Sequence, residues 1–317
     1  MLSKKLFRIG TRDSKLALWQ ANLVQQLLES KGHKCTLVPV KSEGDLDLVT
    51  PLYAMGVQGV FTKTLDAYLL SDKIDIAVHS MKDVPTQLAN GIAQAAVLKR
   101  GNYADLLVFK NESSKALFTS EDQSIQQNLQ GIVATGSVRR KAQLLHRFPR
   151  LQIENLRGNV QTRLQKLQDN QWEAAVFAAA GLERIEERPA LAIELEWMLP
   201  APAQGAIMIA CREGDEQSLN ACYEGNDAPT EHCVRIEREF LSTLMGGCST
   251  PISALAKLQE GTIHFRGSIL SLDGKVQFDI ELQEELSQAR NLGRTAAEQL
   301  LNQGAKQLVE EIRNLGK

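Results

Sequence analysis

The fold is decided near the N-terminus, where residues 6–40 read LFRIGTRDSKLALWQANLVQQLLESKGHKCTLVPV. The apolar start of this stretch predicts a strand, and its last five residues predict a second strand. Between them, Leu16, Trp19, Leu23 and Leu27 recur at helical spacing, which predicts an amphipathic helix. Because a strand, a helix and a strand in this order favour a parallel sheet, we expect an α/β fold.

The same alternation continues and then begins again. Further strands are predicted at 74–78, 131–134, 151–155 and 174–177, with helices at 62–71, 138–147 and 159–169. Both sets place hydroxyl residues between a strand and a helix, as Thr11 and Ser14 in the first and as Thr135 and Ser137 in the second. We therefore expect two similar, largely parallel α/β lobes that face a cleft.

The pattern changes near residue 229. A helix is predicted at 231–244, followed by the turn Gly246-Gly247-Cys248. Three strand-like runs come next, with Asp273-Gly274 as a hairpin turn, and two helices separated at Gly304 close the chain. This third region is predicted to be an α+β domain with a small antiparallel sheet.

Composition narrows the class of protein. The 317 residues carry 36 Lys+Arg against 38 Asp+Glu, a net charge of -2, whereas a nucleic-acid-binding domain usually has a basic excess. Five widely spaced cysteines favour free thiols over disulfides or a metal site. The sequence shows neither a signal peptide nor an apolar run long enough to span a membrane. We expect a cytoplasmic protein without a metal.

Arginines occur at three predicted helix starts. Arg12 precedes one helix, Arg139 and Arg140 lie in the first turn of another, and Arg157 precedes a third. A helix N-terminus already carries partial positive charge, so arginine is unfavourable there unless an anion binds between them. The planar guanidinium suits carboxylate or phosphate. The alternative is that these are solvated surface side chains.

The segment IDIAVHSMKDVP, residues 74–85, ends a buried strand with Lys82 and Asp83. Ligands bind beyond the carboxyl ends of such strands, so Asp83 is a candidate to accept N–H donors or to stabilise a developing cation. A turn-capping aspartate is the alternative. Cys248 has small neighbours that leave room around its sulfur, although a buried structural cysteine is the usual reading.

Seven stretches together resemble the hydroxymethylbilane synthase (porphobilinogen deaminase) family. They are RIGTRDSKLALWQA (8–21), DIAVHSMKDVP (75–85), TGSVRRKAQL (135–144), LRGNVQTRLQKL (156–167), AAAGLERI (178–185), LPAPAQGA (199–206) and GGCSTPI (246–252). They occur in the family's order, and AVHSMKDVP and LRGNVxTRLxKL are highly specific to it.

The resemblance implies two periplasmic-binding-protein-like (type II) lobes and a C-terminal α+β domain. The expected domains are 1–103 with 204–224, then 104–203, and then 225–317. The family joins four porphobilinogen molecules head to tail with release of ammonia and yields the linear tetrapyrrole hydroxymethylbilane. It builds on a dipyrromethane cofactor, and it is expected to act as a monomer without nucleic-acid or membrane partners.

The family's functional residues map onto this sequence. By resemblance Cys248 carries dipyrromethane through a thioether, and Asp83 is the catalytic aspartate that contacts pyrrole N–H groups. Each pyrrole bears an acetate and a propionate. The side chains expected to bind the carboxylates of cofactor and substrate are Arg12, Ser14, Lys82, Arg100, Thr135, Ser137, Arg139, Arg140, Arg157, Arg163 and Arg184.

Three motifs depart from the family. The lysine of its mobile-loop Gly-Gly-Lys-Gly is Gln58 here, V-G-Q-G reads Pro202-Ala203-Gln204-Gly205, and T-S-S-L-R-R reads TGSVRR from Thr135. Three other readings stay open: a two-lobed anion-binding protein without activity, a paralogue that loads the cofactor but elongates poorly because of Gln58, and a cysteine hydrolase, for which no histidine base can be placed.

Overall fold

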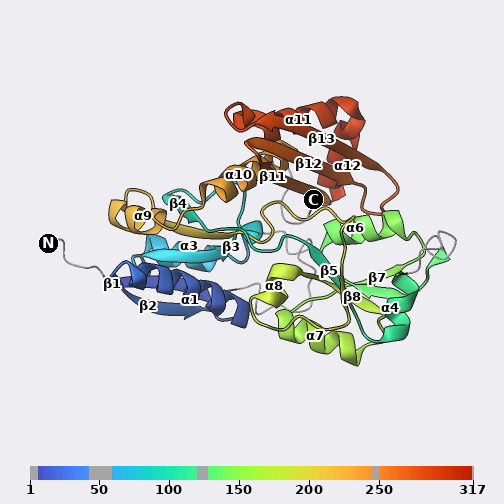
Figure 1. Cartoon of the computed structure of the whole chain (residues 1–317), viewed down its shortest axis with the longest axis horizontal. Coiled ribbons are helices and arrows are strands. Elements are labelled where there is room, and N and C mark those ends of the chain that lie inside the picture. The colour runs from blue at the N-terminus through green and yellow to red at the C-terminus, as the bar shows by residue number, and fades with distance from the viewer. Residues whose placement is uncertain (1–5, 43–58, 120–127, 245–249, 316–317) are drawn as a thin grey trace. The chain divides into compact units, whose positions relative to one another are not determined.

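The computed structural model describes residues 6–42, 59–119, 128–244 and 250–315 (Figure 1). The described chain divides into two compact units. The first consists of residues 6–42, 59–101 and 204–232, and the second of residues 102–119, 128–203, 233–244 and 250–315.

The first unit is built on a five-stranded sheet in the order β2-β1-β3-β10-β4. Strand β1 pairs in parallel with β2 and β3, whereas β10 runs antiparallel between β3 and β4. Helix α1 buries Ala21, Val24 and Leu28 against Phe7 and Ile9 of β1. The elements are β1 (Leu6–Arg12), α1 (Lys15–Ser30), β2 (Lys34–Val40), α3 (Lys63–Leu70), β3 (Ile76–Ser80), the 3-10 turn η2 (Met81–Asp83), β4 (Ile92–Val97), β10 (Ile207–Arg212) and α9 (Glu216–Tyr223).

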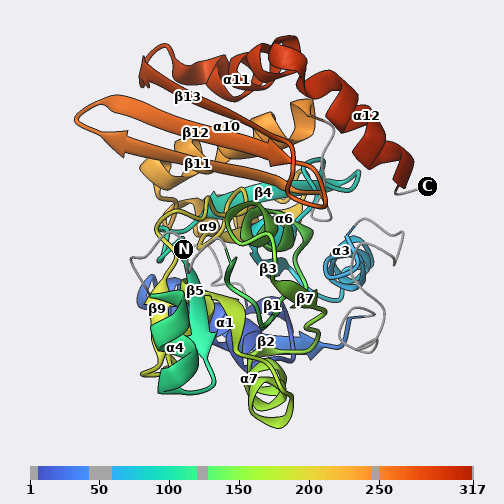
Figure 2. The same cartoon turned by 90° about the vertical axis from the view of Figure 1, so that its right-hand side faces the viewer.

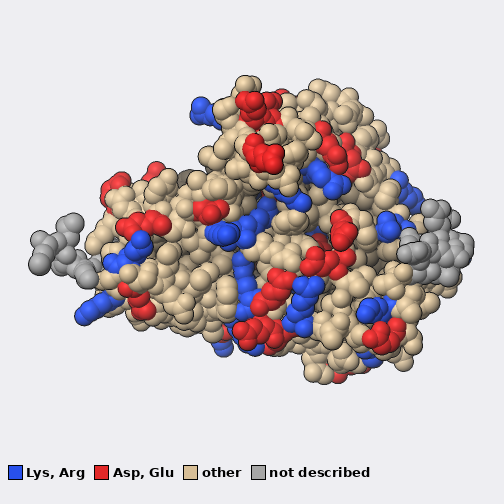
Figure 3. All heavy atoms as spheres, viewed as in Figure 1, with Lys and Arg blue, Asp and Glu red and all other residues tan. Residues whose placement is uncertain are grey.

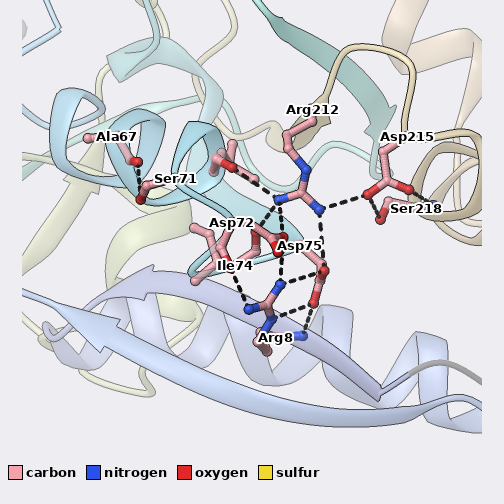
Figure 4. A network of polar contacts seen from close by, with 10 residues as sticks. Arg8, Ala67, Ser71, Asp72, Ile74, Asp75, Arg212, Asp215 and Ser218 are labelled. Carbon is pink, nitrogen blue, oxygen red and sulfur yellow. Dashed lines mark hydrogen bonds and ion pairs between the residues drawn. The ribbon is translucent and has the colours of Figure 1, made fainter.

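An ion-pair network ties the distant segments of this unit together (Figure 4). Asp75, just before β3, is buried and accepts from Arg8 Nε of β1 at 3.0 Å. Arg212 at the end of β10 lies 3.4 Å from the same carboxylate and 3.0 Å from Asp215. Asp75 therefore joins β1 to a strand that follows it by about two hundred residues, which explains how β10 is held in this sheet.

The second unit contains another five-stranded sheet, ordered β7-β6-β8-β5-β9. Strand β6 pairs in parallel with β7 and β8, while β5 runs antiparallel between β8 and β9. This order repeats that of the first sheet strand for strand. The elements are β5 (Asp105–Phe109), α4 (Glu112–Phe118), β6 (Ile132–Ala134), α6 (Val138–Arg147), β7 (Gln152–Glu154), α7 (Val160–Asp169), β8 (Ala174–Ala178), α8 (Ala179–Glu183) and β9 (Ala192–Glu194).

The second unit also carries an antiparallel sheet of three strands, β11-β12-β13 (Figure 2). Its core packs Phe265 of β12 against Phe240 of α10 and Ala296 of α11. Gly267 is required here, because a Cβ would lie 2.6 Å from the Phe240 ring. The elements are α10 (Ala228–Thr243), of which residues 228–232 belong to the first unit, β11 (Ile252–Gln259), β12 (Thr262–Leu270), β13 (Gln277–Glu285), η3 (Ala289–Asn291), α11 (Leu292–Leu300), η4 (Leu301–Ala305) and α12 (Lys306–Leu315).

The predicted fold class is confirmed, since two α/β sheets of one order are followed by a small antiparallel sheet. The prediction of largely parallel sheets needs one correction: β10 and β5 run antiparallel inside them. The break at Gly304 is confirmed, with φ of 112°. Gln58, at the position of the family's mobile-loop lysine, lies outside the described residues. The described helices include none with the length and apolar character needed to cross a membrane.

Candidate active site

In the first unit the candidate residues gather at one edge of the sheet. Strands β1 and β3 are parallel, so their carboxyl ends meet; Arg12 is the last residue of β1, and Asp83 ends the short turn that follows β3. Ser14 caps α1 by accepting from the Ala17 N–H at 3.3 Å. The Arg12 guanidinium lies 4.2 Å from the centre of the Phe61 ring, a cation–π contact that orients it.

Asp83 and Lys82 are adjacent but do not pair with each other. Lys82 Nζ donates to Gln204 Oε1 at 3.2 Å. Asp83 ends the 3-10 turn η2 and is half-buried, and its side chain has no hydrogen bond or ion pair within the described part of the chain. Its carboxylate is therefore available to accept N–H donors from a ligand at the edge of the sheet.

The segment around Gln204 is hydrogen-bonded to the residues at this edge of the sheet. The Met81 N–H donates to the Ala206 carbonyl at 3.0 Å, and the Gly101 N–H donates to the Gly205 carbonyl at 3.0 Å. Arg100 Nε donates to the Gln204 carbonyl at 2.8 Å. Arg100 is thus held by protein backbone, and Gln204 is buried between Lys82 and Arg100.

His79, on β3, is buried next to this edge. Burial, and then the nearby Arg12 cation, lowers the pKa of His79 to about 4. The imidazole is therefore neutral at neutral pH, and it leaves Arg12 as the charged group beside it.

This shift predicts a stability loss in acid. The unfolded chain binds a proton at His79 as pH falls through about 6.5, but the folded chain does so only near pH 4, so unfolding gains protons in that window. We expect the free energy of unfolding to fall by about 3 kcal/mol between these pH values, and His79→Gln to lack that share of the decline. Denaturant unfolding at several pH values measures both; equal acid slopes in the two proteins would contradict the assignment.

In the second unit the candidates also follow parallel strands. Thr135 and Ser137 come after β6, and Ser137 caps α6 by accepting from the Arg140 N–H at 3.5 Å. The loop after β7 lies directly alongside, because a Cβ on Gly136 would be only 2.5 Å from the Leu156 carbonyl oxygen. The glycine that departs from the family's TSSLRR motif thus permits a close approach of the loops that carry Ser137 and Arg157.

Arg139 and Arg140 are buried around one internal carboxylate, Asp105, at the start of β5. Arg139 Nη2 lies 2.6 Å from Asp105 Oδ2, and Arg140 Nη2 lies 2.7 Å from Oδ1. Burial alone would raise the pKa of Asp105, but the two guanidiniums outweigh it and hold that pKa well below its usual range. Asp105 thus supplies the anion that the arginines at this helix start require, and the cluster keeps one excess positive charge.

The remaining arginines of this unit differ in burial. Arg157 is buried, and its carbonyl accepts from Lys166 Nζ at 3.2 Å. Arg163 is half-buried, and its Nε donates to the Gly158 carbonyl at 2.7 Å. Burial lowers the pKa of Arg184 to about 10, although the neighbouring Glu183 raises it. Side chains of this kind fit an anion site that is partly shielded from water.

The second family departure, Ala203, has a structural consequence. Its φ is 61°, the left-handed region that favours glycine, which is the residue of the family's V-G-Q-G at this position. The strain is about 1 kcal/mol. A hydrogen bond of 2.6 Å from the Ala203 N–H to the buried Glu237 carboxylate holds the residue there, and Glu237 also accepts from the Ala256 N–H at 2.8 Å.

The structure places the predicted site residues in both units: Arg12, Ser14, Lys82, Asp83 and Arg100 belong to the first, and Thr135, Ser137, Arg139, Arg140, Arg157, Arg163 and Arg184 to the second. The sequence did not predict three residues that hold these side chains or their neighbours. Asp105 binds Arg139 and Arg140, Gln204 binds Lys82, and Gln143 binds the Leu199 carbonyl. Cys248 lies outside the described residues. The described residues hold no cluster of three or more His, Cys, Asp or Glu side chains that could bind a metal.

Comparison with known proteins decides the family. Residues 7–220 match the family model "Porphobilinogen deaminase, dipyromethane cofactor binding domain", and residues 231–302 match "Porphobilinogen deaminase, C-terminal domain". The chain belongs to the porphobilinogen deaminase family. A porphobilinogen deaminase of Syntrophotalea carbinolica is 41% identical, with 98% of this chain and 97% of that protein covered. One of Pelobacter propionicus is 38% identical, with 96% of each chain covered.

The model that matches residues 7–220 is that of the family's dipyrromethane cofactor binding domain. Among solved structures, an ancestral cationic amino acid solute binding protein is similar over 69% of this chain and 87% of that one, with 15% identity and a TM-score of 0.45. Lys and Arg stand among Asp and Glu on the face seen in Figure 3, as the net charge of -2 suggests.

Proposed function

We propose that this chain is an active hydroxymethylbilane synthase that joins four porphobilinogen molecules on a dipyrromethane cofactor. The observation that carries the proposal is the Asp83 carboxylate, which stands at the carboxyl end of β3 without a partner in the described chain while Lys82 beside it is held by Gln204. A purely anion-binding protein has no use for an unpaired carboxylate at such an edge, since it would repel the ligand.

Asp83 would act electrostatically in each addition. The reaction breaks the bond between the aminomethyl carbon and nitrogen of porphobilinogen, forms a carbon–carbon bond to the next pyrrole, and releases ammonia with the proton that this pyrrole loses. Positive charge develops on the substrate ring as ammonia leaves. A carboxylate hydrogen-bonded to the ring N–H stabilises that charge more in the transition state than in the ground state.

The residues present fit the dipyrromethane group. The excess positive charge around Asp105 suits its acetate and propionate side chains, and the buried Arg139 Nε has no hydrogen-bond partner within the described chain. We propose that Arg139, Arg140, Arg157, Arg163 and Arg184 hold carboxylates of the cofactor and growing chain, with Thr135 and Ser137 as hydroxyl donors. Arg12, Ser14, Lys82 and Arg100 would do so from the first unit. The group, bound to Cys248, supplies the pyrrole carbon to which the first substrate is joined.

Three further assignments follow the family. We propose that the chain divides into domains 1–103 with 204–224, 104–203 and 225–317, that it acts as a monomer, and that it works in the cytoplasm. Two sheets of equal strand order and a separate antiparallel sheet support the division.

Intact-protein mass spectrometry tests the function. We expect the protein, after incubation with porphobilinogen, to carry an added mass equal to dipyrromethane, and Cys248→Ser to lack it. Cys233→Ser, which changes a buried cysteine of α10, serves as the control and should keep the added mass. An unmodified wild-type mass would refute the proposed function. A loaded protein that releases no hydroxymethylbilane would favour the reading of a poorly elongating paralogue.

A further inference from the structure

A chain of buried hydrogen bonds runs through the second unit, from the arginine cluster to the antiparallel sheet. It begins at Asp105, which binds Arg139 Nη2 at 2.6 Å. Arg139 Nη1 donates to the Leu199 carbonyl, also at 2.6 Å. The Leu199 peptide is bound in turn by Gln143, and Gln143 reaches Ser253 near the start of β11. All five residues are buried.

Gln143 is the centre of this chain, because its amide makes three hydrogen bonds. Its Oε1 accepts from the Leu199 N–H at 2.8 Å. Its Nε2 donates to the Leu199 carbonyl at 3.0 Å and to Ser253 Oγ at 3.1 Å. The backbone N–H and the backbone carbonyl of Leu199 are thus both bound by one side chain, away from water. Loss of the amide would leave three buried polar groups with fewer partners, which buried polar groups tolerate poorly.

We propose that Gln143 is a positioning residue for the reaction: it fixes the Leu199 carbonyl that anchors Arg139, and it links that anchor to Ser253. The proposal rests on the proposed function, in which Arg139 binds carboxylates. Ser253 lies five residues after Cys248, in the strand that follows the cofactor segment. Through Gln143 the carboxylate-binding arginine and this strand share one rigid support.

The geometry of α6 explains why this one helix can contact both Asp105 and the antiparallel sheet. Arg139, Gln143 and His146 are spaced at i, i+4 and i+7 and so lie on one helix face. His146 Nδ1–H donates to the Gly274 carbonyl at 2.7 Å, in the turn between β12 and β13. The same turn approaches the α6 backbone so closely that a Cβ on Gly274 would lie 2.6 Å from the Ala142 carbonyl oxygen. Helix α6 is therefore fixed to the sheet at two points, with Arg139 at its first turn.

The position of the Leu199 carbonyl matters because, in the described chain, the Arg139 guanidinium is anchored at two different nitrogens while its Nε has no partner. If the Leu199 peptide shifts, one anchor is lost and the guanidinium turns about Asp105. Arg139 would then keep its charge but lose its direction toward a ligand carboxylate, which weakens binding more than chemistry.

The test compares Gln143→Leu and Ser253→Ala with the wild type and with Asn111→Ala. Asn111 caps α4 in the same unit. Asn111→Ala is expected to reduce the free energy of unfolding by an amount similar to that of the other variants, but it leaves the hydrogen bonds of Gln143 intact. We measure KM and kcat of the loaded enzyme for porphobilinogen, the rate at which the apoprotein gains the dipyrromethane mass, and the thermal unfolding temperature.

We expect Gln143→Leu to raise KM about tenfold and to slow loading, with kcat per loaded molecule within about twofold of the wild type. Ser253→Ala, which removes only one of the three bonds, should raise KM about threefold. Asn111→Ala should keep the wild-type KM. If Gln143→Leu does not fold, Ser253→Ala decides. Wild-type KM and loading in the variants, with only a lower unfolding temperature, would overturn the positioning role. A wild-type protein that gains no dipyrromethane would instead refute the function itself.

Discussion

Asp83→Asn is expected to lower kcat by about 10²- to 10³-fold while the protein stays folded. Asparagine has nearly the same shape, so the 3-10 turn of Met81–Asp83 and the bond between Lys82 and Gln204 should persist. What is lost is the negative charge that would oppose the positive charge on the substrate ring. The measurement is the rate of hydroxymethylbilane release per molecule that carries dipyrromethane, with the loaded fraction read by mass spectrometry.

Asp13→Asn provides a matched control. Asp13 is an exposed carboxylate in the turn between β1 and α1, so this variant removes the same charge from the same unit without changing the candidate catalytic group. We expect its kcat to stay within about twofold of the wild type, because exposed charges are screened by water and salt. A kcat near that of the wild type in Asp83→Asn would remove Asp83 from the mechanism.

Local patterns predicted the parts of this fold that depend on neighbours in sequence. The helix at 138–147 was predicted with the bounds that α6 has, because its apolar periodicity and its capping serine are both local signals. The hairpin turn at Asp273-Gly274 is of the same kind. Strand β10 could not be predicted in this way. It lies in the first sheet between β3 and β4, and its place there is stabilised by contacts between residues distant in sequence, such as Arg212 with Asp75.

In the candidate site, too, only the features that depend on neighbours in sequence could be predicted. Arginines at helix starts and an aspartate after a buried strand can be read from the sequence, since the ends of parallel strands are known to meet. The partners of those residues cannot. Asp105 opens a strand that reads as ordinary core, DLLVF, and only the antiparallel pairing of β5 with β8 brings it to the arginines. Gln143 did have a local signal, because it lies one helical turn after Arg139 on the same face of α6.

Asp105→Asn is expected to have the largest effect on stability, a loss of about 3–5 kcal/mol in the free energy of unfolding. The carboxylate is fully buried and binds both Arg139 and Arg140, which are themselves buried. An amide leaves two guanidinium charges facing each other in a region of low dielectric. Denaturant unfolding of wild type and variant at neutral pH measures the difference.

Asp75→Asn is the control for this comparison, because Asp75 is equally buried and also lies between two arginines. Its partners differ in exposure: the side chains of Arg8 and Arg212 are 34% and 22% exposed, against 4% and 6% for Arg139 and Arg140. Water can therefore solvate the charges that Asp75→Asn leaves behind. We expect a smaller loss, about 2 kcal/mol. Equal losses in the two variants would show that burial of the arginines does not set the cost.

The pH dependence separates the charge of Asp105 from its shape. The folded-state pKa of Asp105 is depressed, so its contribution is complete above the unfolded value of about 3.9 and is lost as pH falls through the much lower folded value. Wild type should therefore lose stability steeply below about pH 4, and Asp105→Asn should show a shallower decline over the same range. If the two acid limbs run parallel, the two guanidiniums do not hold Asp105 ionised in the folded protein, and the excess positive charge assigned to this cluster would have to come from elsewhere.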